Sequence, residues 1–339
     1  MDRAGLKRSG ELERVELLER ILRRPGASGV ALAIGDDAAL LEPGTELLVW
    51  TVDVQVEHVH FERRWLGWDE LGYRATMAAA SDLAAMAAQP RGVLGSLVLP
   101  AETTDAELGA LCAGQAQACD ELGTALIGGN LARGGELSIT TTVLGAARKP
   151  LCRVGARPGD QIALAGPVGM AGAGLALLQR GLAHGSPATG ARAAALHAWR
   201  RPIARIAEGR RVAELGSSAI DLSDGLACDA ARVVRASSAA GMPLCMVLEA
   251  KPLLGPELRE LGAELGVSPI ELALHGGEDY ALLVTLPPGD TPQGFVRVGW
   301  CEPLGADGVP LLLARADGSR VPVSARGFDH FGEHEPPAG

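Results

Sequence analysis

Short apolar runs of strand length alternate with helix-like segments along most of this 339-residue chain. Strand-like runs such as "GVLGSLVLP" (92–100) and "YALLVTLP" (280–287) are separated by helical patterns such as "DAELGALCAGQAQACDELG" (105–123). Because the two patterns are mixed throughout, we expect an α/β or α+β fold in which mixed sheets pack against helices.

The length and one proline- and glycine-rich segment predict two domains. A chain of this size is too long for one ordinary core. The segment "RKPLCRVGARPGD" (148–160) follows a predicted strand, which is typical of a domain boundary. We therefore expect domains over residues 1–148 and 149–339.

Composition excludes several classes of protein. Aromatic residues make up 3% of the chain and the net charge is −10, so neither base stacking nor a basic surface favours nucleic-acid binding. The six cysteines form no C-x-x-C pair, and they are expected to be reduced thiols. The uncharged stretch 161–179 contains a proline and many small residues, which favours a glycine-rich loop and helix over a membrane span. We expect a cytoplasmic protein that binds neither nucleic acid nor membranes.

Local patterns predict two details of the first half. The segment "EPGTE" (42–46) lies between two apolar runs and predicts a hairpin. The helical pattern that begins at Trp68 is expected to stop at Pro90. Residues 200–216 are also expected to be helical.

Common catalytic motifs are missing. The sequence contains no G-K-[ST], which excludes a P-loop, and neither H-E-x-x-H nor G-x-S-x-G is present. The glycines of "GPVGMAGAG" (166–174) do not match G-x-G-x-x-G. They are more simply explained by a tight turn and a close helix contact.

Unusually placed carboxylates are the strongest chemical signal. Asp36 and Asp37 follow a glycine at a predicted strand end, where a turn is the simpler explanation. Asp53 lies in the alternating strand "TVDVQVE", whose polar side is expected to face solvent. Asp82 is the only charged residue between Ala75 and Pro90 and lies on the apolar stripe of its helix. A carboxylate buried there must be paired or bound to a metal.

The stretch "DLSDGLACD" (221–229) holds three aspartates around one glycine. One explanation is a helix start capped by Ser223 or Asp224, and the other is a metal site. Glu278 and Asp279 likewise follow two glycines just before a strand. Acids beside glycines in both halves suit several Mg²⁺ ions that bridge to phosphates, so a magnesium-nucleotide enzyme without a P-loop is indicated.

Eight segments occur in the order typical of one known family. The sequence resembles thiamine-monophosphate kinase from residue 35 to residue 331. The segments are "GDDAALL", "TVDVQVEHVHF", "SDLAAMAAQP", "LIGGNLARG", "RVGARPGD", "DLSDGLACD", "GGEDYALLVT" and "GFDHF". The wider superfamily contains aminoimidazole ribonucleotide synthetase and selenophosphate synthetase.

The resemblance implies a two-domain aminoimidazole ribonucleotide synthetase-like fold whose N-terminal domains, which bind Mg-ATP, pair in a homodimer. It implies transfer of phosphate from ATP to thiamine monophosphate, giving thiamine diphosphate, with several Mg²⁺ ions as cofactors. The C-terminal domain would complete the active site. The acceptor is a phosphate whose second pKa is ~6 by analogy with phosphoserine, so no general base is assigned.

The resemblance also implies residue roles. The magnesium ligands would be Asp37, Thr51, Asp53, Asp82, Asp221 and Asp224. ATP would meet Gly129, Asn130, Arg153 and Ser223, with Arg153 as a stabiliser of phosphate. The thiamine end would be lined by His60, Glu278 and Phe328. Asp229 is expected to support or cap the site rather than to bind metal.

The sequence departs from the family pattern after its double glycine. The family has G-G-D-T-T-R, whereas this chain has "GGNLAR", so Asn130 replaces a carboxylate. Alternatives to the kinase therefore stay open. They are a paralogue for another phosphorylated substrate, another superfamily enzyme that uses ATP to activate a substrate oxygen, and a nucleotide-binding paralogue with impaired catalysis.

Overall fold

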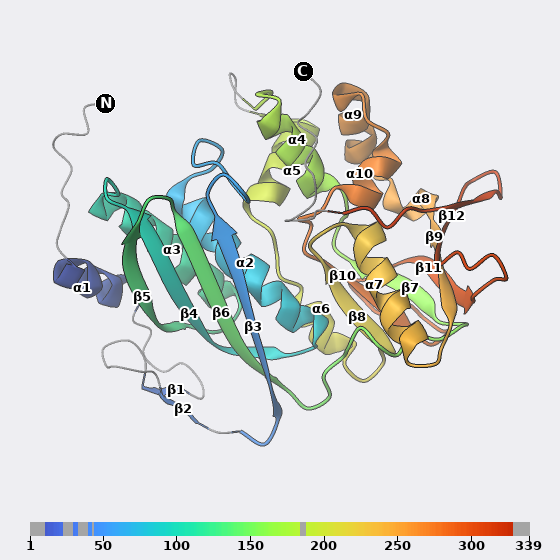
Figure 1. Cartoon of the computed structure of the whole chain (residues 1–339), viewed down its shortest axis with the longest axis horizontal. Coiled ribbons are helices and arrows are strands. Elements are labelled where there is room, and N and C mark those ends of the chain that lie inside the picture. Colours follow the sequence, from blue (N-terminus) through green and yellow to red (C-terminus); the bar gives the residue numbers. More distant parts are fainter. Residues whose placement is uncertain (1–10, 23–29, 33–39, 43, 184–187, 328–339) are drawn as a thin grey trace. The chain divides into compact units, whose positions relative to one another are not determined.

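The computed structural model describes residues 11–22, 30–32, 40–42, 44–183 and 188–327. The chain divides into two compact units (Figure 1). The first unit runs to Cys152 and also contains Arg200–Asp221, and the second contains Arg153–Trp199 and the chain from Leu222 onward. A boundary near residue 148 was expected from the sequence, but the return of 200–221 to the first unit was not.

That return has a local cause in helix packing. Helix α6 (Ile206–Arg211) packs on α2 (Trp68–Ala85). A Cβ at Gly209 would lie 2.1 Å from the carbonyl oxygen of Ala84, so the two backbones touch at this glycine. Helix α6 is shorter than the helix expected over 200–216.

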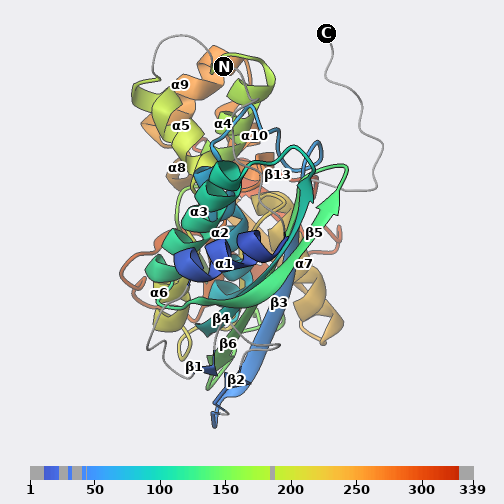
Figure 2. The ribbon, with the colours of Figure 1, turned by 90° about the vertical axis from the view of Figure 1, so that its left-hand side faces the viewer.

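The first unit is built on one mixed sheet, and helices α2 and α3 cover one face of it (Figure 2). The strand order is β3-β6-β4-β5, in which only the β4–β5 pair is parallel. The remaining elements of this unit are α1 and the small β1–β2 sheet. The bounds are α1 Glu11–Leu22, β1 Val30–Leu32, β2 Leu40–Leu41, β3 Leu47–Val56, β4 Gln89–Pro100, α3 Asp105–Glu121, β5 Leu126–Gly134 and β6 Ser138–Ala147.

Two local predictions in this unit were wrong. The hairpin at 42–46 does not form, because β2 pairs with β1 and β3 pairs with β6. The helix that begins at Trp68 ends at Ala85, and Pro90 lies in β4. Ala87 has a positive φ of 55°, which turns the chain from the helix into the strand before Pro90 is reached.

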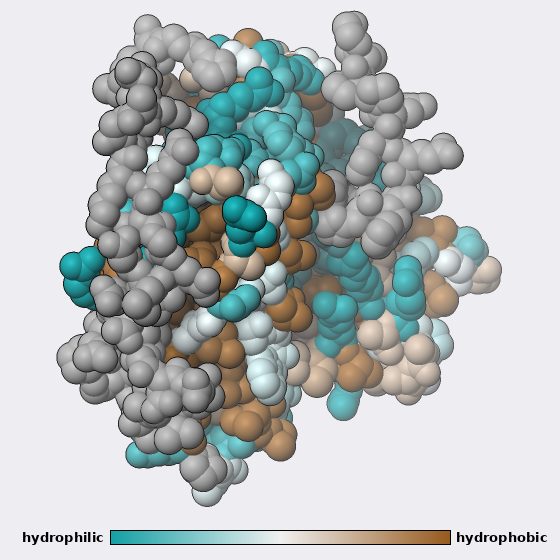
Figure 3. All heavy atoms as spheres, turned by 60° about the vertical axis from the view of Figure 1, so that its left-hand side comes forward, coloured by the Kyte–Doolittle hydropathy of each residue, from teal (hydrophilic) through white to brown (hydrophobic). Residues whose placement is uncertain are grey.

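Strand β3 buries the opposite side from the one that its alternating sequence predicts. The polar residues Thr51, Asp53 and Gln55 are half-buried or buried, whereas Trp50 is 71% exposed and Val52 is 64% exposed. The polar side therefore faces α2, and the apolar side faces outward. Hydrophobic side chains gather on the surface in the view of Figure 3.

The second unit is built on a mixed sheet with the strand order β13-β12-β9-β11-β7-β10-β8. The division between the units passes through β8, after Asp221. The strands are β7 Gln161–Ala165, β8 Ser218–Leu222, β9 Leu244–Glu249, β10 Ala281–Leu286, β11 Val296–Pro303, β12 Leu311–Ala314 and β13 Arg320–Pro322. The helices are α4 Met170–Gln179, α5 Gly190–Arg200, α7 Leu226–Ala239, α8 Ala250–Leu253, α9 Pro256–Leu265 and α10 Pro269–His275.

The structure also bears on the cysteines and on the expected absence of a membrane-spanning helix. All six cysteines are free thiols, four of them buried. Among the described residues, no helix combines the length and apolar character that crossing a membrane requires.

Helices α2 and α3 cross through two glycines, and this crossing can be tested. A Cβ at Gly72 would lie 1.9 Å from the carbonyl oxygen of Leu111, and one at Gly114 would lie 1.9 Å from that of Asp69. We expect Gly72→Ala to lower the free energy of unfolding by about 2–3 kcal/mol, although alanine is the better helix former by about 1 kcal/mol. Gly135→Ala, where a Cβ meets nothing within 4 Å, serves as the control in urea denaturation. Equal stability of the two variants would contradict the crossing.

Candidate active site

A cluster of oxygen ligands lies between β3 and α2 in the first unit. The Thr51 hydroxyl donates to Asp82 Oδ2 at 2.5 Å. Asp53, two residues along the same face of the strand, accepts the Val54 N–H at 2.8 Å and the Gln55 amide at 3.3 Å. The hydrogen bond from Thr51 satisfies the prediction that Asp82 needs a partner in its apolar helix.

The pKa of Asp53 is shifted by burial and by its neighbours in this cluster. Burial raises the pKa of Asp53 above its usual value, and its two hydrogen bonds oppose that shift. The neighbouring His60 lowers the pKa and Asp82 raises it. His60 itself accepts the Val56 N–H on Nδ1 at 3.0 Å, just after the end of β3. The structure thus brings together four of the predicted residues: Thr51, Asp53, His60 and Asp82.

Gly129 and Asn130 lie on β5 of the same sheet. A Cβ at Gly129 would come within 2.0 Å of the Gly95 carbonyl oxygen, so close strand pairing already requires a glycine there. Asn130 is in register with Ser96 and, through β6, with Val54. It therefore lies on the outward side of the sheet, and the fold of one chain does not bring its side chain to Asp53. Asp36, Asp37 and Phe328 lie outside the described residues.

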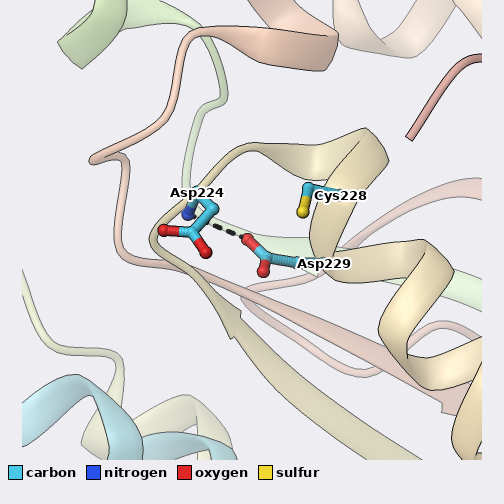
Figure 4. Close-up of side chains that lie close together, drawn as sticks. All are labelled: Asp224, Cys228 and Asp229. Atoms are coloured by element: carbon cyan, nitrogen blue, oxygen red, sulfur yellow. Dashed lines mark hydrogen bonds between the residues drawn. The ribbon is translucent and has the colours of Figure 1, made fainter. Parts of the chain in front are cut away.

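Two of the three aspartates of 221–229, Asp224 and Asp229, have a basic partner just beyond that stretch. Arg232 donates to Asp229 Oδ1 at 2.5 Å through Nη1 and to Asp224 Oδ2 through Nη2. Asp229, whose side chain is 1% exposed, also accepts the Asp224 N–H at 3.1 Å (Figure 4). Asp229 thus binds both the backbone N–H of Asp224 and the arginine that pairs with Asp224.

This arrangement corrects the helix-cap alternative for the stretch. The N-cap of α7 is Gly225, at φ +118°, and no side-chain cap bond forms there. Burial raises the pKa of Asp229 to about 6, and Arg232 acts against this shift.

Asp224, Cys228 and Asp229 are the one group of three or more histidine, cysteine or acidic side chains in the described part of the chain whose ligand atoms all lie within 4.8 Å of one another. Asp221, at the end of β8, is buried but stands outside that group. The guanidinium of Arg232 already supplies positive charge to Asp224 and Asp229, so an added metal would share these carboxylates with it.

The predicted substrate-binding residues of the second unit meet at the turn before β10. The Glu278 N–H donates to the Ser223 carbonyl oxygen at 2.7 Å, which places Ser223 and Glu278 side by side. The Glu278 carboxylate accepts the Trp199 indole N–H at 2.5 Å. Sequence reasoning missed Trp199, because α5 was not predicted. Arg153 is exposed, and its carbonyl oxygen accepts from Ser237 Oγ at 3.5 Å.

Asp279 caps the N-terminus of helix α4, a role that the local sequence pattern did not predict. Its two carboxylate oxygens accept the N–H groups of Gly169 at 2.7 Å and Ala171 at 3.1 Å. These are the first amides of α4, whose N-cap Gly169 has no side chain to cap them. The acid thus anchors a helix about 110 residues earlier in the chain.

A pH-dependent stability follows from Asp279. Burial raises its pKa to about 7, although the two helix amides oppose the shift. The folded chain therefore takes up a proton between the unfolded pKa of ~3.9 and about 7, and the free energy of unfolding decreases as pH rises through this range. We expect Asp279→Asn to remove this dependence and to cost about 1 kcal/mol, because one amide oxygen replaces the two carboxyl oxygens that accept from Gly169 and Ala171. Urea denaturation over that pH range, with the exposed Asp290→Asn as control, measures both effects. An unchanged slope would contradict the assignment.

Comparison of the sequence and the fold with known proteins indicates the class of fold. Residues 35–147 match the family described as AIR synthase related protein, N-terminal domain. The hydrogenase maturation protein HypE in complex with ATP shares the fold, with a TM-score of 0.72 at 18% identity over 95% of each chain. The molecule thus has an AIR synthase-like fold of mixed sheets and helices.

Relatives of higher identity define the family more narrowly. The chain is 32% identical to thiamine-monophosphate kinase of Aquifex aeolicus (strain VF5), over 83% of this chain and 87% of the relative. It is 33% identical to that of Escherichia coli (strain K12), over 89% and 92%. A solved structure, AaThiL complexed with AMPPCP and TMP, aligns with a TM-score of 0.76 at 28% identity over 97% of this chain and all of that one. This chain belongs to the thiamine-monophosphate kinase family, which confirms the resemblance found in the motifs.

Proposed function

We propose that this protein transfers the γ-phosphoryl group of ATP to thiamine monophosphate, which gives thiamine diphosphate and ADP. The observation that carries the proposal is the full-length similarity to thiamine-monophosphate kinases, including a relative solved with an ATP analogue and TMP. The oxygen-rich clusters of both units are consistent with it. The other superfamily reactions have no comparable support.

Magnesium fits the residues of the first unit. Thr51, Asp53 and Asp82 offer a hydroxyl and two carboxylates from one face of β3 and the facing side of α2, and hard oxygen ligands are those that Mg²⁺ prefers. When bound, Mg²⁺ would neutralise charge on the transferred phosphate. Asp37, Asp221 and Asp224 remain proposed ligands. Asp53 would enter this role deprotonated, and its raised pKa means that protons compete with the metal at a higher pH than for an ordinary aspartate.

The acceptor end of the proposal rests on charge complementarity. The thiazolium ring of the acceptor is cationic, and Glu278 would place a carboxylate beside it. Ser223 adjoins Glu278 through the backbone, so residues assigned to ATP and to thiamine lie next to each other. Arg153 would donate to phosphate, His60 and Phe328 would contact the ring, and Gly129 and Asn130 would contact ATP. Positioning and charge stabilisation would suffice for the transfer without a general base.

The proposed activity is tested by ADP release in a coupled assay with thiamine monophosphate and a magnesium titration. We expect the wild-type chain to turn over and Asp53→Asn to lose about 100-fold or more in kcat/KM, on the order of 3 kcal/mol. Asp317→Asn makes the same chemical change in an exposed turn and should leave activity unchanged.

Two further measurements with the same assay test the metal assignment and distinguish the kinase from the alternative functions. Protons compete with Mg²⁺ for Asp53, so the magnesium requirement should rise as the pH falls, and at a higher pH than for an ordinary aspartate. ATP consumption without thiamine monophosphate would favour another superfamily reaction. Nucleotide binding without turnover would favour a paralogue with impaired catalysis, and turnover in Asp53→Asn equal to wild type would refute the metal assignment.

The proposal includes a cytoplasmic homodimer formed through the first unit. The outward face of its sheet carries Leu48, Trp50, Val52 and Val54 on β3 and Leu94 on β4, all exposed. Val52, Thr142 and Leu94 are cross-strand neighbours, so these residues form a continuous surface. An apolar sheet face of this kind is costly to leave in water, which favours its burial against a second copy. The absence of a cysteine pairing pattern supports the cytoplasmic location.

A charge on the outward face should prevent this association. We expect Trp50→Glu to give the 34.9 kDa mass of one chain in light scattering, whereas the wild type gives twice that mass. Leu215→Glu introduces the same charge at an exposed leucine outside the sheet and should remain dimeric. A monomeric wild type, or a dimeric Trp50→Glu variant, would overturn the proposed interface.

A further inference from the structure

The Glu278 carboxylate, at the proposed acceptor end, accepts a hydrogen bond from a tryptophan. Trp199, the penultimate residue of α5, is completely buried. Its indole N–H donates to Glu278 Oε2 at 2.5 Å across 79 residues of sequence. A buried indole has only this one polar group to satisfy, so its hydrogen bond gives the carboxylate a defined direction.

The backbone on both sides of Glu278 is fixed as well. Glu278 has a φ of +58°, which is uncommon for a residue with a side chain. Its N–H donates to the Ser223 carbonyl oxygen, and the N–H of Tyr280 donates to that of Leu222 at 2.9 Å. Asp279, between them, is tied to α4. With the backbone held, the side-chain torsions of Glu278 are the freedom that the Trp199 bond restricts.

The choice of donor matters for the charge. Arg232 holds Asp224 and adds a positive charge there, whereas an indole donates a hydrogen bond and adds none. The Trp199 bond therefore gives the Glu278 carboxylate a direction and adds no charge of its own. Holding it in one rotamer before the ligand arrives avoids an entropic cost on binding.

We propose that Trp199 is a positioning residue that orients the Glu278 carboxylate toward the cationic ring of the acceptor and so sets the affinity for thiamine monophosphate. This inference rests on the proposed function. It assigns Trp199 no contact with the nucleotide or with the transferred phosphate.

The test is steady-state kinetics of Trp199→Phe, which keeps an aromatic ring and removes the N–H. We expect KM for thiamine monophosphate to rise about five- to tenfold, with kcat and KM for ATP within about twofold of wild type. Trp300→Phe is the matched control, because Trp300 Nε1 donates to Glu302 Oε2 at 3.2 Å in the same unit. It should leave all three parameters unchanged.

A double-variant cycle shows whether Trp199 acts through Glu278. Glu278→Gln should itself raise KM for thiamine monophosphate, and adding Trp199→Phe should then change it by less than about twofold. A purely structural role for Trp199 would instead reduce kcat or raise both KM values, in either background. Independent effects of the two changes, or an unchanged KM in Trp199→Phe, would overturn the inference.

A wild-type measurement covers the case in which Trp199→Phe does not fold. Thiamine monophosphate alone should shift the Trp199 indole N–H resonance, and inorganic phosphate alone should not. No shift with a saturating acceptor would overturn the inference. Failure of the wild type to phosphorylate thiamine monophosphate at all would refute the proposed function, whereas normal turnover with an unaltered Trp199→Phe variant would refute only the role of Trp199.

Discussion

Removing carboxylates from water is the constraint around which the polar interior of this chain is organised. Each such group is costly unless a donor or cation replaces its lost hydration. The chain uses a different donor in each place, and the donor determines what the carboxylate can still do. The pairs are Thr51 with Asp82, Arg232 with Asp224 and Asp229, the α4 amides with Asp279, and Trp199 with Glu278.

The same constraint explains the reversed strand β3. A strand that alternates between valines and polar residues ordinarily buries the valines. Here the polar side faces α2, where the Thr51 hydroxyl donates to Asp82. The apolar side is left outward, with Trp50 and Val52 exposed. The polar cluster and the apolar surface are thus two sides of one strand, and a second copy on the outer side would leave the inner side intact.

Much of the fold follows from patterns that are local in sequence. Most strands and the long helices were predictable, since apolar periodicity and capping residues are read over a few neighbours. The hairpin at 42–46 was mistaken because β3 pairs with β6, about 90 residues later in the chain, and β2 pairs with β1. Likewise, 200–221 returns to the first unit because Gly209 meets α2, a contact with no local signature.

The sequence by itself determined the family, the mixed fold and the carboxylates on which the proposed chemistry rests, because motif order and residue type are properties of the chain alone. Tertiary structure decided which side of β3 is buried, that Arg232 balances Asp224, and that Asp279 anchors a helix while Glu278 beside it is held by Trp199. Adjacent acids acquire different roles because their partners are chosen by packing between distant segments. The free energy of a buried charge depends on those partners rather than on its neighbours in sequence.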